Sequence, residues 1–255
     1  MECLEGRQSV LAALQSRSRR FEVILIRQGT HEERIREVLE AAAAARVPVK
    51  RVSGRELNAL AHGASHGGVL AVCSSKSPTT ADELLELLRR AGHQPLLLLI
   101  EGIEDARNLG FTLRSAQAMG ADAVLIKKHL WDFDETEVAR AASGALDRMP
   151  MVQVEDVQLL QRLKGEGLRL LGCVAGAKRS IDEADLTAGV ILAVGGEKRG
   201  LSGAVRSICD LLVSIPTVAG GPSLSLSHAA AVVLAEARRQ RIRYNNSERQ
   251  PPMKG

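Results

Sequence analysis

Two short loops near the C-terminus have residue types suited to holding a flat or polyanionic small molecule. The first runs from Gly195 to Ser202 (GGEKRGLS), and its three glycines let a backbone pass close to a ligand. The second, from Pro216 to Ser225, is nearly free of large side chains. Each follows a short apolar run, Val190–Val194 or Leu211–Ile215, of the kind that forms parallel strands buried on both faces. Ligands of open parallel sheets bind where loops leave the carboxyl ends of strands, so the two loops predict a pocket.

A third stretch with candidate chemistry follows the apolar run Pro95–Ile100 and contains Asn108 and Arg114 (EGIEDARNLGFTLR). Asn108 is a candidate helix cap, and Arg114 falls about one and a half turns into the expected helix. An exposed arginine there would only aid solubility, whereas one directed into a pocket would bind a phosphate or stabilise a developing oxyanion. The residues alone leave both interpretations open.

Several other kinds of site are disfavoured by what the motifs lack. No GxGxxG follows a strand, so the dinucleotide-binding fingerprint is missing. Gly195 and Gly200 have the spacing of a phosphate loop, but Leu201 stands where that loop needs lysine. His62 and His66 have a helical spacing, yet the glycines around them favour a loop over a metal site. The absence of a GxSxG elbow disfavours an acyl-transfer hydrolase.

The elements that would position these loops alternate between strand and helix. From Pro95 onward, the expected strands are Pro95–Ile100, Ala123–Lys127, Met151–Val154, Leu168–Val174, Val190–Val194 and Leu211–Ile215. The expected helices are Leu109–Met119, Glu135–Leu146, Val157–Lys164, Gly203–Ser207 and Leu226–Arg241. This alternation predicts an α/β fold with a parallel sheet covered on both faces.

Residues 1–73 predict a separate small α/β domain. Its expected elements are helix Glu5–Leu14, strand Phe21–Ile26, helix His31–Ala45, strand Val47–Arg51, a helix opening at a Ser53–Glu56 capping box, and strand Val69–Cys73. Residues 74–94 begin polar and then predict an amphipathic helix around Asp82–Arg90, so we expect this segment to link two domains. The second domain then spans residues 95–243, and the polar, proline-containing residues 244–255 predict a disordered tail.

Composition narrows the class of protein and of partner. The chain has 255 residues, with 45% hydrophobic and 25% charged, as is ordinary for a soluble globular protein. One Trp, one Tyr and three Phe disfavour aromatic platforms for stacking bases, while the net charge of +4 leans towards anionic partners. Four widely spaced cysteines without a CxxC pair predict a cytoplasmic protein with no zinc site and no disulfides. Neither a signal peptide nor a membrane-spanning run is expected.

Three blocks of residues, in order along the chain, resemble the SpoU-type (TrmH-like) RNA ribose 2′-O-methyltransferases of the SPOUT superfamily. They are Asn108-Leu109-Gly110 with Arg114-Ser115-Ala116, Gly195-Gly196-Glu197 with Gly200-Leu201-Ser202, and Ile215-Pro216 with Ser223-Leu224-Ser225-Leu226-Ser227. Two further segments resemble that family's ribosomal-protein-like substrate-binding domain, namely Gly6-Arg7-Gln8-Ser9-Val10 and His66-Gly67-Gly68-Val69. The resemblance covers nearly the whole chain. Each block alone would be weak support for it, but three blocks in order at the ends of strands are specific to the family.

The resemblance implies a fold, a cofactor and a set of site residues. It implies a C-terminal trefoil knot that binds S-adenosylmethionine, and a homodimer that forms the active site. Periodicity could not reveal the knot, because chains as a rule avoid one. The family's cofactor-binding positions fall on Gly195, Gly196, Ile215, Pro216 and Leu224. Its catalytic positions fall on Asn108, Arg114, Glu197, Ser223 and Ser225.

The implied reaction moves a methyl group from a sulfonium to a ribose 2′-hydroxyl, a poor nucleophile near neutral pH. The family's arginine at Arg114 is assigned as the base. Because a guanidinium is effectively always protonated, we instead expect Arg114 to clamp a phosphate and stabilise the emerging oxyanion. Glu197 and Asn108 would orient Arg114 or the ribose, and Ser223 would hydrogen-bond the nucleotide; a plain solvated carboxylate is the alternative for Glu197. The family usually has asparagine where this chain has Ser225, and serine lacks the amide.

RNA contacts are expected from basic residues, and their strength should fall steeply with salt. The candidates are Arg17, Arg19, Arg20, Lys127, Lys128, Lys198, Arg199, Arg238, Arg239, Arg241 and Arg243. For the last four, compensation of a helix macrodipole is the alternative. Family analogy favours 23S ribosomal RNA over transfer RNA as the substrate. A catalytically silent RNA-binding protein of the same fold is a second hypothesis, and a nucleotide-using enzyme is a disfavoured third.

Overall fold

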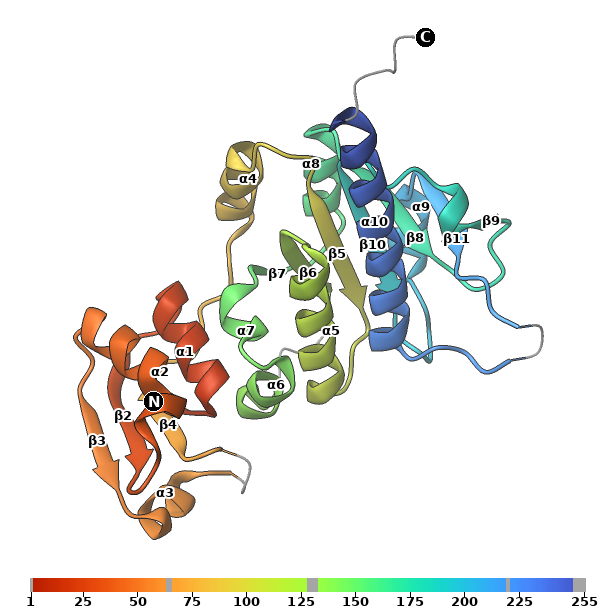
Figure 1. The fold of residues 1–255 in the computed structure, drawn as a ribbon. Coiled ribbons are helices and arrows are strands. Elements are labelled where there is room, and N and C mark those ends of the chain that lie inside the picture. The colour runs from red at the N-terminus through yellow and green to blue at the C-terminus, as the bar shows by residue number, and fades with distance from the viewer. Residues whose placement is uncertain (1, 63–65, 128–132, 219–220, 250–255) are drawn as a thin grey trace. The chain divides into compact units, whose positions relative to one another are not determined.

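The computed structural model describes residues 2–62, 66–127, 133–218 and 221–249. The chain forms two compact units, shown in Figure 1. The first comprises Met1–Pro78, Asp105–Arg114 and Asp132–Met149, and the second comprises Thr79–Glu104, Ser115–Trp131 and Pro150–Gly255. Helix α5 (Ala106–Met119) passes from the first unit into the second.

The first unit is built on a four-stranded sheet with the strand order β1-β4-β2-β3. Strand β2 pairs in parallel with β3 and antiparallel with β4, which in turn pairs antiparallel with β1. The elements are β1 (Glu2–Glu5), α1 (Arg7–Ser16), β2 (Phe21–Arg27), α2 (Glu32–Ala44), β3 (Val49–Val52), α3 (Gly54–Leu60), β4 (Val69–Cys73), α6 (Glu135–Ala142) and α7 (Ala145–Arg148). The predicted capping box of Ser53 and Glu56 is confirmed at the start of α3.

The N-terminus differs from the expected helix beginning at Glu5. Residues Glu2–Glu5 form strand β1 instead, and Gly6, with a positive φ of 91°, turns the chain into α1. A positive φ suits glycine and breaks the helical path, so the helix begins only at Arg7. The sheet therefore gains an edge strand that the apolar pattern did not predict.

The expected helix Glu135–Leu146 is divided into α6 and α7, and both pack within the first unit. Ser143 and Gly144 have positive φ values of 50° and 92°, which ends α6. A Cβ added to Gly144 would lie 2.9 Å from the carbonyl oxygen of Gln8 in α1, so the break brings the chain close to that helix. Helix α1 contacts both α6 and α7, and the Ser9 hydroxyl donates to the Ala139 carbonyl at 3.2 Å.

The second unit is built on a seven-stranded sheet in which every neighbouring pair is parallel, so the prediction of a parallel α/β sheet is confirmed. The strand order is β7-β6-β5-β10-β8-β11-β9. The elements are α4 (Ala81–Arg90), β5 (Leu96–Glu101), β6 (Ala123–Lys127), β7 (Met151–Gln153), α8 (Gln158–Gly165), β8 (Arg169–Cys173), β9 (Arg179–Ser180), η1 (Ile181–Glu183), β10 (Val190–Gly195), α9 (Gly203–Ile208), β11 (Leu211–Ser214) and α10 (Leu226–Arg249).

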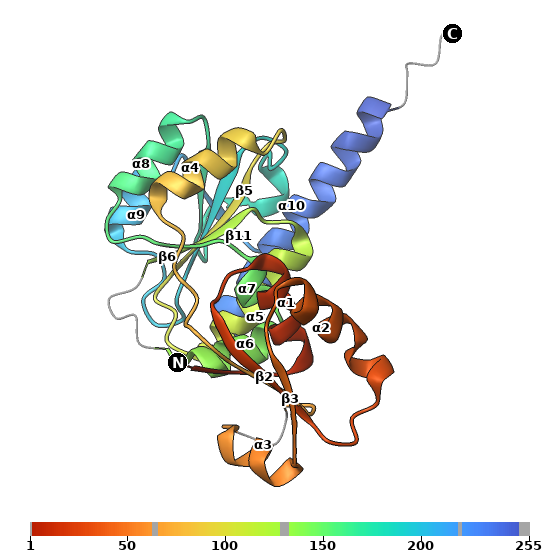
Figure 2. The ribbon, with the colours of Figure 1, turned by 90° about the vertical axis from the view of Figure 1, so that its left-hand side faces the viewer.

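Helices cover both faces of this sheet, which explains its unbroken apolar strands. Figure 2 shows α4, α8 and α9 on one face and α10 on the other. Alternate strand residues such as Leu97 and Ile191 join Leu84 of α4 in one buried cluster. On the other side, α10 packs against β10 and β5. Because side chains of successive residues point to opposite faces, a strand covered on both must be apolar throughout.

Part of the predicted disordered tail is helical. Helix α10 runs to Arg249 instead of ending at Arg241, so residues 244–249 belong to it, while residues 250–255 lie outside the described part of the chain. The sequence has no proline or glycine between Arg241 and Pro251, so nothing in it breaks the helix earlier. The short strand β9 was likewise not predicted, because a two-residue strand has no periodicity.

Candidate active site

The two predicted loops leave the same edge of the parallel sheet in the second unit. Strand β10 ends at Gly195, which pairs with Glu101 at the end of β5. Strand β8 lies between β10 and β11, so the loops after β10 and β11 flank its end. The structure thus brings Gly195, Gly196 and Glu197 to the edge from which Ile215 and Pro216 also leave.

The glycines of the first loop close a tight hairpin. The Gly200 amide donates to the Gly196 carbonyl at 2.8 Å, and Gly200 has a positive φ of 61°. A Cβ on Gly195 would overlap the backbone of Gly200 and Leu201, and one on Gly196 would overlap the Gly102 carbonyl. The packing of the loop itself therefore requires glycine at these positions. The sequence had suggested a different reason, namely close approach of a ligand. Glu197 is exposed at the tip.

A partly buried hydrogen-bond network that the sequence did not predict anchors this hairpin. Glu101 accepts from the Lys127 ammonium at 2.9 Å and from the Ser202 backbone amide at 2.8 Å. Partial burial alone would raise the pKa of Glu101, but the hydrogen bonds from Lys127 and Ser202 outweigh it and hold that pKa below its ordinary value. Lys127, expected to contact RNA, is instead engaged here; its neighbour Lys128 lies outside the described residues.

The second loop combines exposed small residues with exposed apolar ones. Pro216, Ser223 and Leu224 are exposed and Ile215 is half-buried, while residues 219–220 lie outside the described part. Ser225 precedes α10, and its hydroxyl accepts from the backbone amide of His228 at 3.4 Å and lies 2.6 Å from the His228 Nδ1. Ser225 therefore acts as a helix cap, a role that serine and asparagine both fill well.

Asn108 and Arg114 lie on the part of α5 that belongs to the first unit. The backbone amide of Asn108 donates to Asp105 Oδ1 at 2.8 Å, so Asp105 caps the helix and the cap interpretation of Asn108 is wrong. Asn108 is half-buried and Arg114 is exposed. A Cβ on Gly110, from the same sequence block, would overlap Ala141 at 2.5 Å, so that glycine allows α5 to lie against α6.

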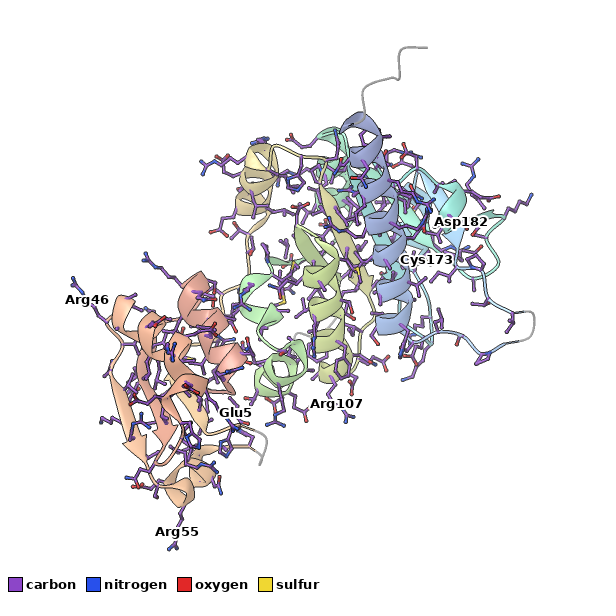
Figure 3. The ribbon with its side chains drawn as sticks, in the orientation of Figure 1. Glu5, Arg46, Arg55, Arg107, Cys173 and Asp182 are labelled. Atoms are coloured by element: carbon purple, nitrogen blue, oxygen red, sulfur yellow. The ribbon has the colours of Figure 1, made fainter. Side chains whose placement is uncertain are left out.

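The basic candidates of the first unit separate into one structural and two exposed residues. Arg19 is buried and pairs with Asp147 at 2.6 Å and with Glu135, so its expected role as an RNA contact is wrong. Arg17 and Arg20 are exposed and line a hollow of about 490 Å³ together with Arg46, which points outwards in Figure 3.

The basic cluster of α10 is also partly structural. Arg241 donates to the carbonyl oxygens of Pro95 at 2.9 Å and Ala188 at 2.7 Å, so it fastens the helix to the amino end of the sheet. Burial lowers the pKa of Arg241, although the nearby carboxylates act in the opposite direction. Arg239 pairs with Glu236 at 2.6 Å. Because α10 continues to Arg249, this arginine cluster does not lie in the last turn of the helix, and the alternative of macrodipole compensation is not supported.

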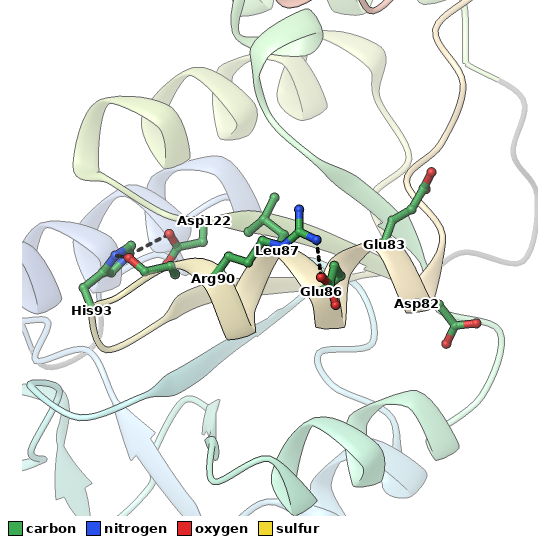
Figure 4. A pocket seen from close by; sticks show the side chains of 8 residues that line it. Asp82, Glu83, Glu86, Leu87, Arg90, His93 and Asp122 are labelled. Atoms are coloured by element: carbon green, nitrogen blue, oxygen red, sulfur yellow. Dashed lines mark hydrogen bonds and ion pairs between the residues drawn. The ribbon is translucent and has the colours of Figure 1, made fainter.

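A groove along α4 lies away from the predicted site residues. It has a volume of about 670 Å³, and Figure 4 shows its side chains. Arg90 pairs with Glu86 at 2.5 Å, and His93 lies 2.8 Å from Asp122. The first is an ion pair on the surface of α4 and the second a hydrogen bond beyond its end, and none of the predicted site residues lines the groove.

Neither a metal centre nor a membrane span emerges from the described residues. None of their helices combines the length and apolar character needed to cross a bilayer. Over the same part of the chain, no group of three or more His, Cys, Asp or Glu side chains is placed to hold a metal ion.

Family models match both halves of the sequence. The model of the SpoU rRNA methylase family matches residues 95–235, more than half of the chain. The chain belongs to this family. A second model, for RNA 2′-O ribose methyltransferase substrate binding, matches residues 3–79 of this SpoU family member. The resemblance drawn from the three sequence blocks is thus confirmed.

Known proteins resemble this SpoU methylase over nearly its full length. The 23S rRNA (guanosine-2′-O-)-methyltransferase RlmB of Pseudomonas putida is 36% identical over 242 residues, covering 94% of this chain and 97% of that protein. A crystal structure of an RNA 2′-O ribose methyltransferase aligns with a TM-score of 0.75 at 28% identity, covering 94% of this chain and 88% of that one. The AdoMet complex of the SpoU methyltransferase AviRb from Streptomyces viridochromogenes shares the fold, with a TM-score of 0.77 at 24% identity and coverage of 94% and 90%.

Proposed function

We propose that this SpoU methylase transfers a methyl group from S-adenosylmethionine to the 2′-hydroxyl of a guanosine in 23S ribosomal RNA. The observation that carries the proposal is the match to RlmB, which extends over 94% of this chain and includes both the catalytic and the substrate-binding regions. The expected preference for ribosomal over transfer RNA rests on the same match.

The two loops at the carboxyl edge fit the methyl donor. Val218 and Leu224 are apolar yet 80% and 38% exposed, so they offer surface that an adenine ring would cover. Backbone groups of the hairpin at Gly195 and Gly196, and of Ile215 and Pro216, would supply hydrogen bonds to the base and sugar. S-adenosylmethionine brings a methyl group already activated on a sulfonium.

Four residues are assigned to the reaction itself. We place Arg114 against the phosphate and the oxygen that gains negative charge, since a guanidinium holds its proton and is suited to stabilise an oxyanion. Asn108 and Glu197 orient Arg114 or the ribose, and Ser223 hydrogen-bonds the nucleotide. The exposure of Arg114, Glu197 and Ser223 supports these assignments, because each side chain is accessible to a substrate.

RNA recognition is assigned to residues 1–73, the domain that precedes the linker at 74–94. The match of the substrate-binding model to residues 3–79 supports this, as does the hollow lined by Arg17, Arg20 and Arg46. Exposed arginines around a concave surface provide the phosphate contacts that dominate affinity for nucleic acid.

A trefoil knot and a homodimer complete the proposal. Strand β10 lies between β5 and β8, with β11 beyond β8, so the chain must return past β8 before α10 packs on β10 and β5. This return path supports a knot in the second domain, residues 95–243. The homodimer is proposed from the family resemblance, in which two copies of the chain form the active site together. As a ribosomal RNA enzyme the protein would act in the cytoplasm.

Mapping of ribose methylation tests the function directly. Ribosomal RNA from cells with and without the protein is compared, and purified protein is then incubated with labelled S-adenosylmethionine and 23S rRNA. We expect one guanosine to lose its 2′-O-methyl group without the protein and to gain label in vitro. Binding of S-adenosylhomocysteine and RNA without any transfer would instead establish a silent RNA-binding protein. Methylation of transfer RNA in place of 23S rRNA would show that transfer RNA is the substrate.

A further inference from the structure

The ends of two neighbouring strands and the exit of the glycine hairpin meet in one small network. Glu101 ends β5 and Lys127 ends β6, and their side chains are only 12% and 16% exposed. Glu101 Oε1 accepts from Lys127 at 2.9 Å, while Oε2 accepts from the backbone amide of Ser202 at 2.8 Å. Lys127 also lies 3.3 Å from the Ser202 hydroxyl. Both carboxylate oxygens are therefore in use.

This network determines where the hairpin ends and the next helix begins. The Ser202 hydroxyl accepts from the Val205 amide at 3.3 Å and so caps α9. At the other end of the hairpin, Gly196 lies against Gly102, the residue that follows Glu101. The exit of β5 thus holds both ends of the hairpin that β10 enters.

A second ion pair at the same edge of the sheet is exposed to solvent. Lys198 lies 2.6 Å from Glu104, but the two side chains are 77% and 67% exposed. Exposed pairs contribute little, whereas removing one partner of a buried pair leaves the other charge uncompensated. The two pairs therefore offer a test and its matched control within a few residues of each other.

We propose that Glu101 is a positioning residue that fixes the glycine hairpin in the shape that binds the methyl donor, with Lys127 holding the carboxylate in place. The proposal rests on the proposed function, because it takes the hairpin as part of the donor site. Glu101 touches the backbone of the loop and not the reacting groups, so its loss should affect donor binding more than the chemical step.

The test compares the donor affinity of four variants with that of the full-length wild-type protein by calorimetry with S-adenosylhomocysteine. Glu101→Gln should raise the dissociation constant roughly tenfold to a hundredfold, the worth of one hydrogen bond to a charged group. The kcat at saturating donor should change less than threefold. Lys127→Met should weaken donor binding in the same way, and Lys127→Arg, which keeps the positive charge, should restore much of it. Glu104→Gln, the control, should bind the donor as the wild type does.

Amide hydrogen exchange gives an independent readout. The Ser202 amide should exchange faster in Glu101→Gln than in the wild type, because its acceptor is weakened. Equal donor affinity and equal exchange in the two proteins would overturn the proposal. If Glu101→Gln does not fold, the two Lys127 variants decide. Equal donor affinities of Lys127→Met and Lys127→Arg would also overturn the proposal. A wild type that binds no donor would refute the proposed function itself.

Discussion

Substitution of Gly195 by alanine tests the hairpin with the smallest possible change. An added Cβ would overlap the backbone of Gly200 and Leu201, so the hairpin must open. Opening removes the Gly200–Gly196 backbone hydrogen bond of 2.8 Å and disturbs the 2.8 Å bond from the Ser202 amide to Glu101. A neutral hydrogen bond contributes about 1 kcal/mol and one to a charged group about 2 kcal/mol. Together they correspond to about 3 kcal/mol, or roughly a hundredfold in donor affinity.

The matched control is Gly203→Ala. Gly203 is the first residue of α9, and a Cβ there would meet nothing within 4 Å. Alanine also favours the helix by up to about 1 kcal/mol relative to glycine. We therefore expect Gly203→Ala to bind S-adenosylhomocysteine as the wild type does and to be equally or more stable in urea.

Calorimetry with S-adenosylhomocysteine, together with urea unfolding of all three proteins, completes this experiment. The expected order of affinity is wild type equal to Gly203→Ala, with Gly195→Ala roughly a hundredfold weaker, as the lost hydrogen bonds require. If folded Gly195→Ala bound the donor within threefold of the wild type, the closed hairpin would not be the binding form, and the reasoning would be refuted.

Four further substitutions test other parts of the chain. Arg114→Ala should abolish methyl transfer to RNA while leaving S-adenosylhomocysteine affinity within severalfold; normal methylation would show that the arginine has another role. Arg19→Met should lower the urea-derived free energy of unfolding by about 3–5 kcal/mol, because the fully buried Asp147 loses its cation; a loss below about 1 kcal/mol would mean that solvent compensates the carboxylate. Arg20→Ala should weaken RNA binding and reduce its salt dependence by about one phosphate contact in titrations at several salt concentrations; an unchanged slope would remove Arg20 from the RNA surface. Ser225→Asn should leave the melting temperature unchanged, since both residues cap helices well; a clear drop would show that the cap needs the hydroxyl.

Local patterns were enough to predict every strand of the parallel sheet except the two-residue β9, and the loops at its edge. Strands β5 and β10 are unbroken apolar runs that end at Glu101 and Gly195, and such runs follow directly from burial on both faces. The Ser53–Glu56 capping box was also predictable from the sequence, because all its hydrogen bonds join residues within one helical turn.

What the sequence did not predict depends on contacts between distant positions. Ser202 lies 101 positions from Glu101, and Asp147 lies 128 positions from Arg19. No periodicity links such residues, so Arg19 was taken for an RNA contact and Glu101 was not singled out. A charged residue that directly ends a buried strand is the one local signal that could have drawn attention to Glu101 and Lys127.

Helices α6 and α7 determine how this chain can be divided. In the sequence they fall between β6 and β7, two neighbouring strands of the larger sheet, yet they pack on α1. A protein shortened to begin after Pro78 would keep both helices but lose α1, and Asp147 would lose Arg19. Recombination that exchanged the N-terminal segment for another would have to replace α6 and α7 as well. The N-terminal segment therefore cannot be exchanged independently of the rest of the chain. The residues of α1 and those of α6 and α7 are expected to evolve together.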